Sequence, residues 1–178
     1  MSKSYAGEDV EFEDEMRLGT RTELGRKYTP LGVRPTGRQR IGYEYLYLYI
    51  SIKPLTGEIF AMFLPRLDKV CFNIFAQERG KLLKQRTLMI VDGAGAHRLE
   101  EENSWLELSK LPAYSPELNP VERFFQELRR KLKFRVFDSL DEAEEFVTEA
   151  LKEFLTDKER VKSLTMYPYI KDALTNSI

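Results

Sequence analysis

Residues 111–132, LPAYSPELNPVERFFQELRRKL, combine a stiff approach segment with a well-marked helix start. Asn119 is a favoured N-cap residue, and Pro120 suits the first helical position. Apolar residues then recur at helical spacing, namely Val121, Phe124, Phe125, Leu128 and Leu132. Three prolines favour an extended approach: Pro112, Pro116 and Pro120. We therefore predict a helix from Pro120, with Glu122 in its first turn, beside the positive helix end.

The first third of the chain shows strand patterns. Val10 and Phe12 alternate with acidic residues up to Asp14, which is typical of a half-buried strand ending in a carboxylate. Residues 43–52 alternate tyrosines with aliphatic residues, so both faces of this strand should be covered. Thr56-Gly57 marks a turn before a partner strand over residues 58–64. These segments predict three antiparallel strands.

The middle of the chain predicts a crossover helix and parallel strands. Asp68 should cap a helix whose apolar positions are Val70, Cys71, Ile74, Phe75, Leu82 and Leu83. Residues 87–91 form a short aliphatic strand, which should lie parallel to the first strand and bring Asp92 beside Asp14. Residues 105–111 predict a further strand. Periodicity alone therefore indicates an α/β or α+β fold with a mixed sheet.

The length and composition of the chain fit one domain. It has 178 residues, of which 42% are hydrophobic and 12% aromatic. We expect a core over about residues 9–135, a closing helix over 139–156 and a tail over 157–178, which could dock on the core or on another subunit. The longest apolar run, residues 45–52, is too short to span a bilayer, so a cytoplasmic protein without a membrane partner is expected.

The lone cysteine and the charge distribution limit the chemistry. Cys71 excludes an internal disulfide and a cysteine-based zinc site, so oxygen atoms would have to hold any metal. The net charge is −1, but basic residues gather in residues 17–40 and acidic ones in residues 138–159. This segregation favours a DNA-binding face or, equally, ordinary solvated surfaces. Candidate DNA contacts are Arg17, Arg21, Arg38, Arg40 and Arg98.

Three motifs resemble those of one enzyme family. LPAYSPELNPVE resembles the LPxYSPELNPxE signature of DDE transposases of the bacterial insertion-sequence group related to Tc1 and mariner elements. TLMIVDGAGAH, residues 87–97, resembles the strand that carries the second carboxylate of the family. FEDEMRLGTRTELGRKYTPLGVRP, residues 12–35, resembles the segment of the first carboxylate. The resemblance runs from about Glu11 to Leu132, and Ala113 departs from it where the family often has proline.

This resemblance implies a fold, a reaction and a set of ligands. The implied fold is α/β and ribonuclease H-like, a mixed sheet of three antiparallel strands followed by parallel strands, flanked by helices. The implied activity is metal-dependent cleavage of DNA at element ends followed by strand transfer. Asp14, Asp92 and Glu122 would be the catalytic carboxylates and would hold two Mg²⁺ or Mn²⁺ ions, with Asp14 between them. His97 and Asn119 would support them.

Each candidate residue also has a structural interpretation. Asp14 could be an exposed strand-end residue, and Asp92 could form a turn ahead of Gly93. His97 could be a hydrogen-bonded residue or could contact DNA. Asn119-x-x-Glu122 satisfies the helix capping box, as Ser139-x-x-Glu142 does where no chemistry is expected. Capping alone leaves the spaced prolines unexplained.

Two functions and several partners follow from the resemblance. The first function is the catalytic domain of a transposase; the alternative is an inactive remnant that serves as a DNA-binding or assembly module. The first strand begins within about the first dozen residues, so a separate helix-turn-helix polypeptide is expected to recognise the element ends, unless the chain is a fragment. A homodimer and a bacterial cytoplasmic location are further expectations.

Overall fold

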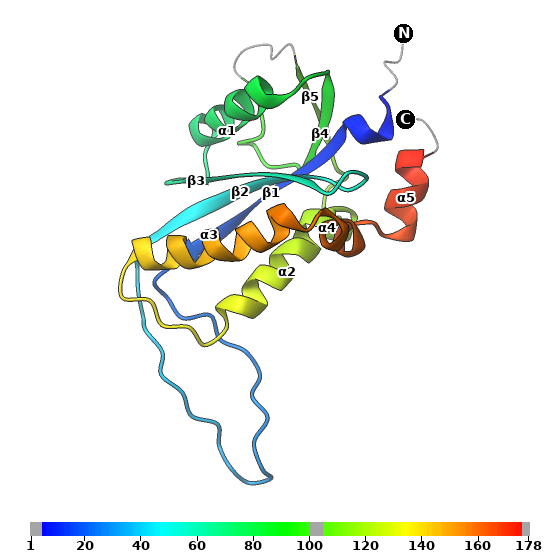
Figure 1. Cartoon of the computed structure of the whole chain (residues 1–178). Helices are drawn as coiled ribbons and strands as arrows, with labels where there is room; N and C mark the ends of the chain where they lie inside the picture. The colour runs from blue at the N-terminus through cyan, green and yellow to red at the C-terminus, as the bar shows by residue number, and fades with distance from the viewer. Residues whose placement is uncertain (1–4, 100–104, 176–178) are drawn as a thin grey trace.

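A five-stranded mixed sheet organises the computed structural model, which describes residues 5–99 and 105–175 (Figure 1). The strand order is β3-β2-β1-β4-β5. The strands are β1 (Val10–Gly19), β2 (Tyr45–Lys53), β3 (Glu58–Leu64), β4 (Thr87–Val91) and β5 (Leu106–Lys110). β1, β2 and β3 pair antiparallel, and β4 and β5 join parallel to β1. This arrangement confirms the predicted fold class.

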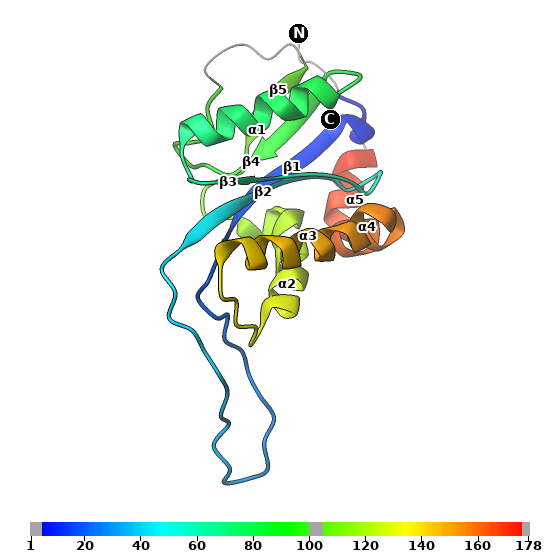
Figure 2. The ribbon, with the colours of Figure 1, turned by 60° about the vertical axis from the view of Figure 1, so that its left-hand side comes forward.

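Helices cover both faces of the sheet (Figures 1 and 2). α1 (Lys69–Leu82) lies on one face, and the other face carries α2 (Pro120–Leu132), α3 (Leu140–Thr156) and α4 (Lys158–Thr165). α5 (Pro168–Thr175) packs near the short 3-10 helix η1 (Gly7–Asp9), and a second such turn, η2 (Pro116–Leu118), precedes α2. Of the helices in these residues, none is both long and apolar enough to cross a membrane.

The C-terminal tail packs on the core. Val161 of α4 and Ile170 and Leu174 of α5 are buried in the same hydrophobic cluster as the apolar face of α2. The sequence allowed the tail to dock either on the core or on another subunit, and the structure shows it on the core. The tail thereby extends the helical layer beyond the closing helix α3.

β1 differs from its prediction in length and burial. It continues five residues beyond Asp14 to Gly19, because residues 14–19 still pair with β2 after the pairing with β4 has ended. It is also not half-buried, since Glu11 and Glu13 are as inaccessible as Val10. α1 covers their side of the strand, and there Glu11 Oε2 accepts two hydrogen bonds from the Arg79 guanidinium. Asp14, in contrast, shares the face of Phe12 and α2.

The buried face of α1 is only partly the predicted one. Its N-cap is confirmed, because the Asp68 carboxylate accepts the amide of Cys71 at 2.9 Å. Val70, Ile74 and Leu82, expected in the core, are exposed by 61%, 40% and 61%, whereas Asn73 is buried. The reason is tertiary: the Asn73 amide donates to the Arg98 carbonyl at 2.9 Å and so ties α1 to the loop after β4.

Residues 20–44 form a long arm that projects away from the sheet between β1 and β2 (Figures 1 and 2). At its base, the amides of Thr20 and Thr22 donate to the carbonyls of Glu44 and Arg40 at 3.1 Å. Its far end exposes apolar side chains, including Tyr28 and Leu31. The arm is therefore held at its base and by the segment after α2, where the Phe134 amide donates to the Glu23 carbonyl at 2.8 Å.

Candidate active site

One pocket gathers the three predicted carboxylates. A cavity of about 410 Å³ is lined by Asp14, Asp92 and Glu122, together with Asn119 and the approach segment 111–116. Phe12 of β1 lies opposite Ile90 of β4, so Asp14 and Asp92, each two residues further along parallel strands, lie side by side. Glu122 enters from the first turn of α2. Three elements distant in sequence thus present carboxylates to one space.

Asp14 is the least accessible carboxylate of this pocket. Its Oδ1 accepts the backbone amide of Glu15 at 2.8 Å. Burial raises the pKa of the Asp14 carboxyl to about 7, even though this amide lowers it. Repulsion from the carboxylates of Glu122, Glu15 and Asp92 acts in the same direction as burial. The site therefore concentrates negative charge, and a cation would relieve it.

Glu122 does not form the capping box that its spacing allows. The Asn119 side chain accepts the amide of Val121 at 3.1 Å, as an N-cap does. The backbone amide of Asn119, however, donates to the Pro116 carbonyl at 3.0 Å in the 3-10 turn before α2. The Glu122 carboxylate is therefore free to line the pocket, where the nearest cation is Arg129, with N and O 3.7 Å apart.

The second predicted capping box provides a contrast. The Ser139 hydroxyl accepts the amide of Glu142 at 3.1 Å, and the Glu142 carboxylate reaches back to the amide of Asp138 at 2.7 Å. The same local sequence pattern thus folds its glutamate onto the backbone in α3 but presents it to the pocket in α2. The η2 turn, which the sequence did not predict, makes the difference.

Asn119 ties α2 to the strand of Asp14. Its side-chain amide donates to the backbone carbonyl of Glu13 at 3.0 Å, and the residue is only 4% exposed. Asn119→Ala should therefore lose both a helix cap and a link between Asp14 and Glu122. We expect a loss of about 1–2 kcal/mol in unfolding free energy, measured by denaturant titration, together with weaker metal-dependent DNA cleavage. Ser139→Ala is the matched control: it should lose about 1 kcal/mol, the cap alone, and cleave normally. Equal cleavage by both variants would contradict the positioning role.

His97 is buried beneath the pocket and contacts Asp92. Its Nδ1 lies 2.6 Å from Asp92 Oδ1, and its ring lies 4.8 Å from the ring of Phe72. Its Nε2 lies 3.0 Å from a Glu15 carboxylate oxygen. Burial lowers the pKa of His97, but the hydrogen bond to Glu15 and the nearby carboxylates outweigh it, so the pKa lies above its usual value. His97 is only 1% exposed, so its ring contacts Asp92 and is almost inaccessible from solvent.

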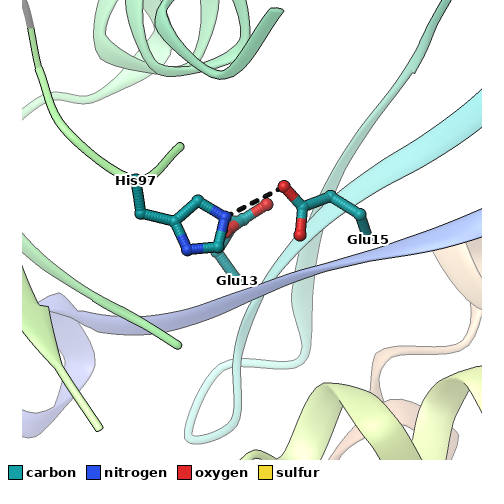
Figure 3. A group of neighbouring side chains, drawn as sticks. All are labelled: Glu13, Glu15 and His97. Carbon is teal, nitrogen blue, oxygen red and sulfur yellow. Dashed lines mark hydrogen bonds and ion pairs between the residues drawn. The ribbon is translucent and has the colours of Figure 1, made fainter. Parts of the chain in front are cut away.

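Glu13 and Glu15, which lie beside His97, were not among the site residues predicted from the sequence. Figure 3 shows both carboxylates turned toward the imidazole from β1. Burial and the neighbouring carboxylates raise the pKa of Glu13 well above its usual value. The available signal was the spacing of Glu11, Glu13 and Glu15, which places three acids on one strand face.

The predicted DNA-binding arginines have different environments. Arg17, Arg21, Arg38 and Arg98 are exposed. The Arg17 guanidinium lies 3.8 Å from the centre of the Tyr45 ring, and with Arg21 it lines a second pocket at the base of the arm. Arg40 instead donates to the carbonyls of Phe137 and Asp138, which gives it a structural role in holding the arm against the segment before α3.

Comparison with known proteins agrees with this fold. The model of the DDE superfamily endonuclease family matches residues 9–144, so the chain belongs to that family. Among solved structures, the Mos1 strand transfer complex is 19% identical at a TM-score of 0.70, with 95% of this chain and 54% of that chain covered.

Two further solved structures of Mos1 complexes are similar to this chain. A pre-cleavage Mos1 transpososome is 16% identical at a TM-score of 0.67, with 96% and 56% covered. The Mos1 mariner paired end complex with Mn is 15% identical at a TM-score of 0.64, with the same shares covered. The likeness confirms the ribonuclease H-like fold, and the chain spans about half the length of these proteins. No curated protein sequence matches significantly.

Proposed function

We propose that this chain is the catalytic domain of a transposase related to the Tc1 and mariner group, which cleaves DNA at element ends and joins the freed strand to target DNA. The observation that carries the proposal is the convergence of Asp14, Asp92 and Glu122 in one pocket of a DDE-family fold. The similar solved structures are transposase complexes described as pre-cleavage and strand transfer states, which supports both steps. Residues 1–178 would act as one domain.

The donor set of the pocket fits hard divalent cations. It offers carboxylate oxygens, and the pKa of Asp14 is raised by burial and by the other carboxylates, a charge excess that cations would neutralise. We propose Mg²⁺ or Mn²⁺, two ions, held by Asp14, Asp92 and Glu122; related Mos1 complexes are described with Mg and with Mn. Such ions would supply an activated nucleophile and charge stabilisation at the leaving oxygen.

The chain's own residues position these ligands. Asn119 couples the first turn of α2 to β1, and so fixes the approach of Glu122 to Asp14. His97 donates to Asp92 from below and limits the rotation of that exposed carboxylate. Segment 111–116 lines the pocket, and a phosphodiester backbone would bind beside it.

DNA is the proposed partner, contacted by the exposed Arg17, Arg21, Arg38 and Arg98, of which Arg17 and Arg21 line the second pocket at the base of the arm. We further propose a separate helix-turn-helix polypeptide for recognition of the element ends. Pairing with a second copy of the chain is also proposed, since the arm exposes Tyr28 and Leu31. The proposed setting is the cytoplasm of a bacterium.

A strand-transfer assay tests the function without knowledge of the cleavage sequence. The purified chain is mixed with supercoiled plasmid and a labelled, pre-cut duplex that carries a free 3′-hydroxyl. With Mn²⁺, we expect plasmid nicking and covalent transfer of the label to plasmid, both abolished by chelator and by Asp92→Asn. Nicking without transfer would indicate a nuclease instead. Transfer that persists in Asp92→Asn would refute the proposed site.

A further inference from the structure

A second group of possible metal ligands lies on the opposite side of β1 from the Asp14 pocket. One oxygen each from Glu13 and Glu15 and one ring nitrogen of His97 all lie within 4.8 Å of one another. His97 Nε2 is 3.0 Å from Glu15 Oε1 and 3.8 Å from Glu13 Oε2. Figure 3 shows the three side chains converging. Alternation along the strand separates this group from Asp14, whose side chain points to the other face.

The environment of Glu13 is independent evidence that this group of side chains has a ligand. Its side chain is fully buried, and neither carboxylate oxygen has a hydrogen-bond partner in the part of the chain that the structure describes. The charged groups that act most strongly on it are themselves carboxylates, those of Glu15, Asp14, Asp92 and Glu11. A buried carboxylate in such surroundings is costly unless a cation or a proton compensates it.

His97 is oriented as metal-binding histidines are. The 2.6 Å distance between Nδ1 and Asp92 Oδ1 places a proton on Nδ1, which donates to that carboxylate. Nε2 lies 3.0 Å from Glu15 Oε1 and 3.8 Å from Glu13 Oε2, and it would give up its proton to bind an ion between these carboxylates. A carboxylate that orients one ring nitrogen while the other binds a metal is a common arrangement around zinc.

From these observations we propose that Glu13, Glu15 and His97 bind one divalent transition-metal ion of the zinc type. An imidazole nitrogen favours Zn²⁺ over Mg²⁺, in contrast to the all-oxygen pocket on the other face. Zinc bonds of about 2.0–2.2 Å to nitrogen and oxygen separate tetrahedral ligands by about 3.3–3.6 Å, and the two imidazole–carboxylate distances, 3.0 and 3.8 Å, bracket that range. The ion would fix His97 and, through it, the orientation of Asp92.

The experiment measures zinc binding directly, without DNA. The chain is freed of metal with chelator and titrated with Zn²⁺ by calorimetry, and the zinc retained after gel filtration is counted by elemental analysis. We expect one retained Zn²⁺ per chain for the parent and for Glu122→Gln, which alters only the other pocket. Glu13→Gln should weaken binding by more than the about 10- to 100-fold typical of losing an outer-shell partner.

A second measurement uses the unaltered protein and so does not depend on the folding of a variant. His97 is the single histidine of the chain, so its ring nitrogen resonances are identified without ambiguity. Zn²⁺ should shift the Nε2 resonance and leave Nδ1 protonated. Zinc binding that survives in Glu13→Gln, or that is lost in Glu122→Gln instead, would overturn the proposal. A parent chain that retains no zinc would also overturn the proposal, because protonation would then be what neutralises the buried Glu13 carboxylate. Neither measurement involves DNA cleavage, so a negative result would not bear on the transposase proposal, which the strand-transfer assay tests separately.

Discussion

Glu122→Gln is expected to lower metal-dependent DNA cleavage by at least about 100- to 1,000-fold, the loss that follows removal of one group that stabilises developing charge. An amide is a much poorer ligand than a carboxylate for a hard divalent ion. The melting temperature without metal should hardly change. The Glu122 side chain caps no amide, and its half-exposed contact with Arg129 at 3.7 Å is an exposed ion pair of about 0–1 kcal/mol.

Glu127→Gln on the same helix is the matched control. Glu127 forms ion pairs with Arg123 and Arg130 on the surface of α2 and does not line the pocket, so this variant should cleave like the parent. Metal-induced stabilisation, measured as the rise in melting temperature on adding Mn²⁺, should persist in Glu127→Gln and shrink in Glu122→Gln. If Glu122→Gln cleaves normally, Glu122 holds no metal; if it melts much lower without metal, its charge is structural.

Local chemistry was sufficient to predict the five strands, the helices α1, α2 and α3 and the caps of these helices, but not η2 or the tail helices α4 and α5. The starts of α1, α2 and α3 follow Asp68, Asn119 and Ser139, and each of these side chains accepts an amide of the following turn. Such caps depend on residues within one turn, so they can be identified in a single sequence. The register of Asp14 and Asp92 followed from strand order, because a crossover helix makes the strands parallel.

Burial of polar groups could not be predicted in the same way. The alternation in β1 indicated that Glu11 and Glu13 face solvent, but the side chains that approach them, Arg79 and His97, lie 68 and 84 residues further along the chain. No local pattern connects them. Similarly, Asn73 is buried in α1 because a loop carbonyl from Arg98 accepts its amide. These are tertiary contacts that override periodicity.

The catalytic and capping interpretations of Glu122 also required tertiary information. The pattern Asn119-x-x-Glu122 satisfies the capping box as well as Ser139-x-x-Glu142 does. The structure separates them because the Pro116 carbonyl takes the Asn119 amide, which leaves the Glu122 carboxylate without a backbone partner of that kind. Pro116 begins the turn that leaves the Glu122 carboxylate free, and Pro112 and Pro116 line the pocket, so two of the three spaced prolines belong to the site.

Arg79→Met is expected to cause the largest loss of stability among single substitutions away from the pocket. Arg79 donates from Nε and Nη2 to Glu11 Oε2 at 2.9 and 2.7 Å, and its Nη1 lies 2.7 Å from Glu58. Arg79 is 3% exposed and Glu11 is fully buried. Removing the guanidinium leaves Glu11 as a buried, unpaired charge, which costs about 3–5 kcal/mol. For a chain of this size that corresponds to a fall of about 6–20 °C in melting temperature.

Two comparisons distinguish the effect of an unpaired charge on Glu11 from the effect of lost packing around Arg79. Lys152→Met breaks the exposed pair with Glu149 and should cost at most about 1 kcal/mol. The double variant Glu11→Met with Arg79→Met removes both charges and should recover most of the loss, because apolar side chains of similar volume replace a buried pair at little cost. A double variant as unstable as Arg79→Met alone would show that the guanidinium acts through packing.

The pH dependence of the stability of Arg79→Met also tests whether the charge of Glu11 causes the loss. Burial raises the pKa of Glu11 even in the parent, and Arg79 opposes this effect, so loss of Arg79 should raise the pKa further. A carboxyl whose pKa is raised by folding destabilises the native state above its unfolded-state value, and the penalty disappears as the pH falls and the group is protonated in both states. The stability deficit of Arg79→Met relative to the parent should therefore narrow toward acidic pH in denaturant titrations. A deficit that is constant with pH would show that the charge of Glu11 is not its cause.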